Sequence, residues 1–156
     1  MKFRNLYADE IEVRVQSFIE KNKTCAGAIL LLYKDARCDM NILDETVGCE
    51  NWQSRFYEQK GILFCSVGIN VNYADSYKEP NWIWKDDAGS ESNTEAEKGN
   101  ASDSRKRAGF CWSIGRELYT SPFIYITADK FEAKSKTGAN NKVIYSTNDK
   151  LWIPLQ

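Results

Sequence analysis

A helical pattern of small and apolar residues runs from residue 94 to residue 119 and forms the longest predicted element. Wound at about 100° per residue, these side chains fall on one arc: Ala101, Ser104, Ala108, Cys111, Gly115, Leu118 and Tyr119. Thr94 and Glu97 have the spacing of a capping box, which begins a helix by satisfying free backbone amides. The arc of small residues predicts that this helix lies close against a sheet or another helix.

Alternating side chains predict a sheet before this helix. Residues 62–73 place lighter, more polar side chains on one face and apolar ones on the other, namely Cys65, Val67, Ile69, Val71 and Tyr73. This alternation is typical of a sheet with one buried face. Residues 52–57 and 82–84 also have strand composition, and the glycine-containing segment 58–61 is typical of a hairpin turn. Residues 87–90 supply turn residues before the helix.

The remaining segments complete the predicted order of elements. Ile11, Val15, Phe18 and Ile19 recur at helical spacing after Asp9, which predicts a first helix over residues 8–22. The further segments are a strand over 26–33, a short helix over 38–47 that ends at Gly48, a strand over 122–127, an exposed loop over 130–142, and a terminal hairpin formed by 143–145 and 151–153. We therefore expect one α+β domain over residues 1–156, with an antiparallel β-β-β sheet and the long helix packed across it.

Composition narrows the class of protein. The chain has 156 residues, 42% of them hydrophobic and 13% aromatic, which is enough for one globular core. No run of about 18 apolar residues is present, and the first ten residues lack the apolar segment of a signal peptide. We therefore expect a cytoplasmic protein without a membrane segment.

The absence of histidine excludes several chemistries. Without it, neither Ser-His-Asp nor Cys-His catalysis can operate, and no histidine can bind a metal. The five cysteines are widely spaced and include no Cys-x-x-Cys pair, so reduced thiols are expected rather than a zinc site. The net charge of −1 at pH 7 argues weakly against an indiscriminate nucleic-acid binder, although a local groove can still be basic.

The cations of the long helix allow two interpretations. Lys98, Arg105 and Arg116 border the apolar arc, whereas Lys106 points further towards solvent. Arg107 follows Asp103 at the i, i+4 spacing of an ordinary intrahelical ion pair. An amphipathic helix with solvated charges explains this pattern, and so does a helix that contacts DNA.

A resemblance to a known family favours DNA contact. The runs Ala96–Ala108 and Trp112–Tyr119 resemble the signature helix of the Rad fifty-two superfamily, most closely its short phage and prophage Sak-type single-strand annealing proteins. The similarity continues upstream through Gly48–Trp52 and Phe64–Gly68 and covers about residues 6–125. In that family, a Lys-Arg pair follows an aspartate in the helix, and a glycine-containing turn closes it. The matching residues in this chain are Asp103, Lys106, Arg107 and Gly115.

The resemblance implies which residues bind DNA. Lys106 and Arg107 match the family's DNA-backbone pair, and Arg14 matches an arginine that follows the aromatic-aliphatic stretch of the family's first helix. Arg105 occupies a position that is often apolar in relatives, so it either adds a phosphate contact or loses a packing contact. Lys98 on the helix border and Arg55 on the hairpin are further candidates. Trp52, Phe56, Tyr57, Trp82 and Trp84 are near enough to stack on bases, but their strand positions favour a place in the core.

The resemblance also implies an activity and partners. The protein would be a phage-type recombinase that binds single-stranded DNA, anneals complementary strands in DNA recombination and repair, and assembles into an oligomeric ring or filament in the cytoplasm of a bacterial host. It would need neither a cofactor nor bond-breaking catalysis, and the chain has no Gly-x-x-x-x-Gly-Lys-[Ser/Thr] run to hold ATP. A host or phage single-stranded DNA-binding protein is a candidate partner.

Two other function classes remain open. A helix on a three-stranded antiparallel sheet also recognises double-stranded RNA. A metal-dependent nuclease is the second alternative, and its carboxylates would be Asp35, Asp39, Asp86, Asp87 and Glu91. Annealing without a metal would count against the nuclease.

Overall fold

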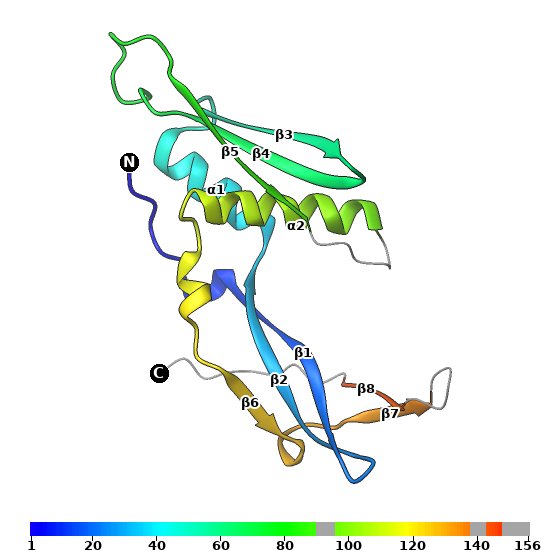
Figure 1. Ribbon diagram of the computed structural model, residues 1–156. Helices are drawn as coiled ribbons and strands as arrows, with labels where there is room; N and C mark the ends of the chain where they lie inside the picture. Colours follow the sequence, from blue (N-terminus) through cyan, green and yellow to red (C-terminus); the bar gives the residue numbers. More distant parts are fainter. Residues whose placement is uncertain (90–95, 138–142, 148–156) are drawn as a thin grey trace. The chain divides into compact units, whose positions relative to one another are not determined.

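The computed structural model describes residues 1–89, 96–137 and 143–147, and its chain divides into two compact units (Figure 1). Unit 1 comprises Met1–Glu10 and Lys34–Tyr119, and unit 2 comprises Ile11–Tyr33 and Thr120–Gln156. The expectation of a single domain stays a prediction.

Unit 1 is built on a three-stranded antiparallel sheet in the order β3-β4-β5. The strands are β3 (Trp52–Gln59), β4 (Ile62–Asn70) and β5 (Trp82–Ala88). The predicted hairpin turn is the two-residue connection Lys60-Gly61, in which both residues have positive φ, as a type I′ turn requires. Strand β5 continues through Asp87 and Ala88, which were expected to form a turn.

Helices α1 (Ala36–Val47) and α2 (Ala96–Cys111) lie on the same side of this sheet (Figure 1). The core between the helices and the sheet is formed by α1, β4, α2 and the turn after α2, with the buried residues Cys38, Ile42, Leu43, Val47, Cys65, Val67, Ile69, Ala108, Trp112 and Ile114. The side chain of Asp35 caps α1 by accepting from the Arg37 amide, and Gly48 ends it at φ +84°, so the predicted short helix and its terminator are confirmed. The N-terminal segment carries a short 3-10 turn, η1 (Ala8–Glu10).

Helix α2 is shorter than expected. It ends at Cys111 rather than at Tyr119, because Ser113 and Gly115 adopt positive φ and turn the chain into the 3-10 segment η2 (Arg116–Thr120). The predicted apolar arc holds within the helix, where Ser104 and Ala108 are completely buried. Thr94 and the side chain of Glu97, the predicted capping box, lie outside the described parts of the chain.

Unit 2 contains the sheet β1-β2-β6, and it corrects the predicted first helix. Residues 11–21 form strand β1 (Ile11–Lys21), which is followed by β2 (Thr24–Lys34) across the turn Asn22-Lys23, while β6 (Ile124–Thr127) pairs antiparallel with β2. The helical spacing gave a wrong prediction, because Ile11, Val13 and Val15 also alternate at strand spacing and are β-branched. Asn22 and Lys23 both have positive φ, so they form a hairpin turn rather than a helix end.

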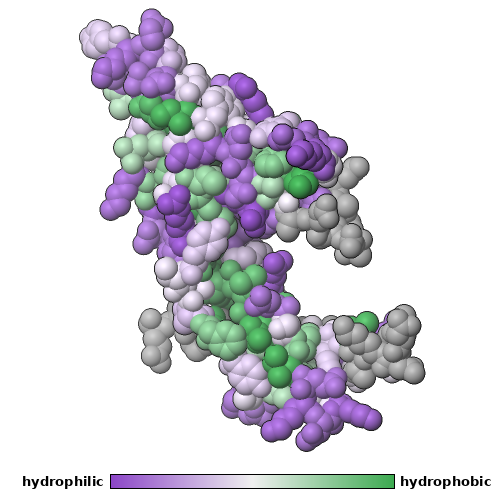
Figure 2. Space-filling model, in the orientation of Figure 1, coloured by the Kyte–Doolittle hydropathy of each residue, from purple (hydrophilic) through white to green (hydrophobic). Residues whose placement is uncertain are grey.

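The core of unit 2 is small. Ala28, Leu30 and Phe131 are buried and are surrounded by half-buried side chains of β1 and β6. Figure 2 shows hydrophobic residues gathered over β2 and β6 and hydrophilic ones at the tip of the β1–β2 hairpin. After the short turn η3 (Ala128–Lys130), strands β7 (Lys134–Thr137) and β8 (Val143–Ser146) pair with each other, so part of the expected loop 130–142 is a strand. Residues 151–153, the expected partner of 143–145, lie outside the described residues.

The α+β class with antiparallel sheets is confirmed. All five cysteines are free thiols. None of the helices in the described ranges has the length and apolar composition of a membrane span.

Candidate nucleic-acid interface

The three consecutive cations of α2 point in different directions. Successive helical residues are rotated by about 100°, so Arg105, Lys106 and Arg107 cannot share one face. Arg107 extends towards β5, where its Nε lies 3.7 Å from Asp87 Oδ1 and about half of its side chain remains exposed. Lys106 is half-buried and lies on the side of Asp35 and Asp39, whose carboxyl groups its charge influences. Only Arg107 of the three is largely available to a ligand.

Arg105 is a packing residue in this fold. Its guanidinium donates to Met40 Sδ at 3.1 Å and to Ser54 Oγ at 3.3 Å, and it lies 5.2 Å from the centre of the Phe56 ring. Its Nε is buried without a hydrogen-bond partner. Arg105 therefore contacts α1 and β3.

Cations gather instead around the C-terminal end of α2. Lys85 Nζ donates to Cys111 O at 3.0 Å, and Arg116 donates from Nε to Phe110 O at 2.7 Å and from Nη2 to Cys111 O at 3.2 Å. Positive groups at the last carbonyls of a helix satisfy free acceptors and complement the helix dipole. With Arg107, which pairs with Asp87, they form a group of three cations near Cys111. We call Lys85, Arg107 and Arg116 the α2 end cluster.

An exposed aromatic ring accompanies the α2 end cluster. The rings of Phe110 and Tyr119 are 4.6 Å apart at 38°, and Tyr119 is 68% exposed. Partial burial raises the pKa of Tyr119, whereas the nearby Arg107 acts in the opposite direction. Unpaired bases stack on rings of this kind while cations hold the phosphates.

A buried ion pair contacts the turn that follows α2. Lys34 Nζ lies 2.5 Å from Asp39 Oδ1, 2.8 Å from Ile114 O and 4.2 Å from the centre of the Phe110 ring. Burial raises the pKa of Asp39 to about 6 and lowers that of Lys34. The pair thus joins the end of β2, α1 and the turn after α2 at a substantial desolvation cost.

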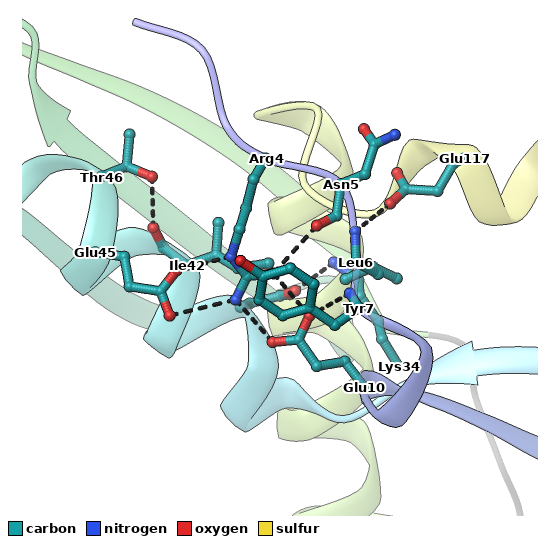
Figure 3. A network of polar contacts seen from close by, with 11 residues as sticks. Arg4, Asn5, Leu6, Tyr7, Glu10, Lys34, Ile42, Glu45, Thr46 and Glu117 are labelled. Atoms are coloured by element: carbon teal, nitrogen blue, oxygen red, sulfur yellow. Dashed lines mark hydrogen bonds and ion pairs between the residues drawn. The ribbon is translucent and has the colours of Figure 1, made fainter.

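A second network fixes the N-terminal segment (Figure 3). Arg4 donates from Nη1 and Nη2 to Glu10 at 2.7 and 2.8 Å and from Nε to Glu45 of α1 at 2.7 Å, while Tyr7 lies beside its guanidinium. The Leu6 amide donates to Glu117 of η2 at 2.6 Å. Arg4 lowers the pKa of Glu10 to about 2 through these hydrogen bonds. The network holds η2, and with it Arg116 and Tyr119, against the N-terminal segment.

The other predicted DNA-binding residues do not join the α2 end cluster. Arg55 lies on the sheet face opposite α2, away from the helix cations. Arg14 belongs to strand β1 of unit 2 and lies 5.2 Å from the Tyr33 ring. Lys98 lies within α2, but its side chain is outside the described set.

The residues that complete the cluster were not selected from the sequence. Arg116 was noted only on the border of the predicted helix, and Lys85 was not noted at all. A helix that ends at Cys111 instead of Tyr119 places Arg116 after the helix end, where it reaches back to the last carbonyls. The glycine at position 115 is the sequence signal for this shorter helix.

The carboxylates of the nuclease alternative already have partners inside the protein. Each described member caps a helix, forms an ion pair or accepts from hydroxyl groups: Asp35, Asp39, Asp86 and Asp87. Glu91 lies outside the described residues. Within the ranges that the structure describes, no group of three metal-binding side chains is formed.

No protein-family model matches the chain, and no curated protein or solved structure matches it.

Proposed function

We propose that this protein binds single-stranded DNA and anneals complementary strands without ATP. The observation that carries the proposal is the α2 end cluster, in which the exposed Arg107 and Arg116 lie near the exposed ring of Tyr119. Lys85 adds a third positive charge at the end of the helix. The likeness of residues 96–119 to the Rad fifty-two signature helix supports the same function. Recombination of phage type in a bacterial cytoplasm, with a single-stranded DNA-binding protein as partner, is the setting that the resemblance suggests.

An annealing protein must hold phosphates while leaving the base edges free to pair. Arginine and lysine bind phosphates without regard to sequence, and each such contact makes the affinity more sensitive to salt. A tyrosine ring that stacks on the face of a base leaves its pairing edge accessible. The α2 end cluster and the ring of Tyr119 together offer both kinds of contact within one unit.

The proposal includes the family's arrangement of a helix across the sheet in a repeating assembly. Contacts of the Trp112 indole with Val67 O at 2.9 Å and of Ala108 with the sheet core support the first part. Exposed hydrophobic side chains in unit 2, such as Phe123 at 76% and Tyr125 at 43%, support self-association. Identical heterologous contacts would place many copies of the cluster along one DNA strand.

An annealing assay tests this proposal. Two complementary labelled oligonucleotides are mixed with wild type, Arg107→Gln or Lys106→Gln, without ATP or metal. Arg107→Gln is expected to slow annealing about tenfold and to reduce the salt slope of DNA binding by about one, because one exposed phosphate contact is lost. Lys106→Gln is expected to have a smaller effect because Lys106 is half-buried beside carboxylates.

The matched control is Arg37→Gln, which removes an exposed cation of α1 that is paired with Asp35 at 3.0 Å. This variant should anneal as wild type does. Wild-type annealing at no more than the spontaneous rate would refute the proposal, and tighter binding of duplex RNA than of single-stranded DNA would favour the RNA-binding alternative.

A further inference from the structure

The register of the β3-β4-β5 sheet separates its two faces. Cys65, Val67 and Ile69 of β4 point into the core with the helices, so their neighbours in the alternation point the other way. Cross-strand pairing adds residues of β3 and β5 to that second face, because Arg55 pairs with Ser66 and Trp84 pairs with Gly68. We call this surface the outer face, and it includes Arg55, Tyr57, Phe64, Ser66, Gly68, Trp82, Trp84 and Asp86.

A flat stack is built at the centre of the outer face. A Cβ atom on Gly68 would lie 2.6 Å from three carbons of the Trp84 indole, so the glycine allows this ring to rest on the backbone of β4. The guanidinium carbon of Arg55 lies 3.8 Å from the centre of a Trp84 ring. Backbone, indole and guanidinium thus form successive layers. Arg55 is exposed, so its guanidinium is open to a further layer.

Two aromatic pairs extend this stack across the sheet. Trp82 lies 6.3 Å from Trp84 at an interplanar angle of 28°, and Tyr57 lies 5.3 Å from Phe64 at 9°. The one carboxylate of the outer face, Asp86, accepts hydrogen bonds from Tyr57 at 2.9 Å and from Ser66. These two hydroxyl donors disperse its negative charge, while Arg55 supplies a cation on the same face.

We propose that the outer face is a base-stacking platform for single-stranded DNA, centred on Arg55, Trp84 and Trp82. The inference deepens the proposed function, since it rests on the binding of single-stranded DNA. Unpaired bases stack on aromatic rings and on guanidinium planes, and an arginine among the rings complements the charge of the phosphates. The platform is separate from the α2 end cluster, because the two lie on opposite faces of one sheet.

The experiment compares an oligothymidylate with an abasic oligonucleotide of the same length. Both carry the same phosphates, so their ratio of dissociation constants at fixed salt measures the contribution of the bases. Wild type should prefer the oligothymidylate by roughly 5- to 150-fold for each stacked base. Arg55→Gln and Trp82→Ala should bring the ratio several-fold closer to one, whereas Arg37→Gln should leave it unchanged.

Each outcome bears on the platform. A ratio that stays at the wild-type value in both variants, or a ratio near one in wild type, would overturn the inference. Arg55 is exposed, so Arg55→Gln tests the platform even if Trp82→Ala fails to fold. If annealing is absent while the base-dependent ratio persists and falls in the variants, the annealing proposal fails and the platform stands. If single-stranded DNA does not bind at all, both fail.

Discussion

The two faces of the β3-β4-β5 sheet use the same residue types for different purposes. On the helix side, Lys85, Arg105 and Arg116 donate to backbone carbonyls, a thioether and a hydroxyl of their own unit. On the outer face, Arg55 lies on the Trp84 indole and remains exposed. Lys85 and Arg105 are half-buried and contribute mainly to holding α2, while Arg107 and Arg116 remain exposed at its end. Arg55 on the outer face can meet a ligand with little loss of stability.

This difference indicates how each face should respond to substitution. A buried charge that loses its partner keeps its desolvation cost, so changes beneath α2 should affect folding first. A surface residue that loses a stacking partner should affect binding first, because solvent replaces the contact. The largest effects on stability are thus expected beneath α2.

The most severe expected change is Lys34→Met. It leaves the Asp39 carboxylate buried without its ammonium partner and should lower the free energy of unfolding by about 3–5 kcal/mol. Urea unfolding followed by circular dichroism measures the loss. The double variant Lys34→Met/Asp39→Leu should recover most of it, because the uncompensated charge is removed. A single variant within about 1 kcal/mol of wild type would show that the pair does not support α2.

A pair of glycine substitutions compares the two faces directly. In Gly109→Ala, the new Cβ would lie 2.5 Å from Asp39 Oδ2 and 3.2 Å from Lys34 Nζ, inside the buried pair. We expect a loss of about 1–3 kcal/mol although alanine favours helices. In Gly68→Ala, the Cβ meets the Trp84 indole at 2.6 Å, but this ring borders solvent and can move away.

Gly68→Ala should therefore cost less stability than Gly109→Ala, and it should reduce the base-dependent ratio of DNA binding because the stack is displaced. Thermal unfolding and the two-oligonucleotide comparison give the two readouts. If Gly68→Ala is the more destabilising variant, the outer face contributes to the core and is not a surface for a ligand.

Strand alternation made the sheet of unit 1 predictable from the sequence. Cys65, Val67 and Ile69 alternate with lighter residues, and the glycine in the 58–61 segment marked the hairpin. The prediction of a first helix was wrong because residues 11–19 satisfy both a helical and an alternating pattern. Pairing with β2 decides between them, and such tertiary pairing cannot be read from local periodicity.

The candidate sites were less predictable than the fold. Arg105, Lys106 and Arg107 are adjacent in the sequence, yet one packs inside, one lies beside carboxylates and one is exposed. Trp82 and Trp84 were assigned to the core, but their register with β4 places them on the outer face. The register of β5 with β4 decides the place of the two tryptophans, and residues 71–81 separate these strands in the sequence. The packing of α2 against α1 and the sheet decides the surroundings of the three cations.

The smallest expected effect lies in the Arg4 network, at the margin of the helix side. Arg4→Ala should lower stability at neutral pH by about 1 kcal/mol, because the ion pairs are only partly shielded from solvent. Arg4 lowers the pKa of Glu10 from 4.5 to about 2, so its contribution is present above pH 4.5 and is lost as the pH falls towards 2. The stability difference between wild type and Arg4→Ala, measured by urea unfolding across this range, should therefore become smaller as the pH falls.

The control variant Arg37→Ala, which breaks an exposed ion pair of α1, should stay within about 0.5 kcal/mol of wild type. A difference for Arg4→Ala that is constant from pH 5 to pH 2 would mean that Arg4 acts through packing on Tyr7 rather than through the carboxylates.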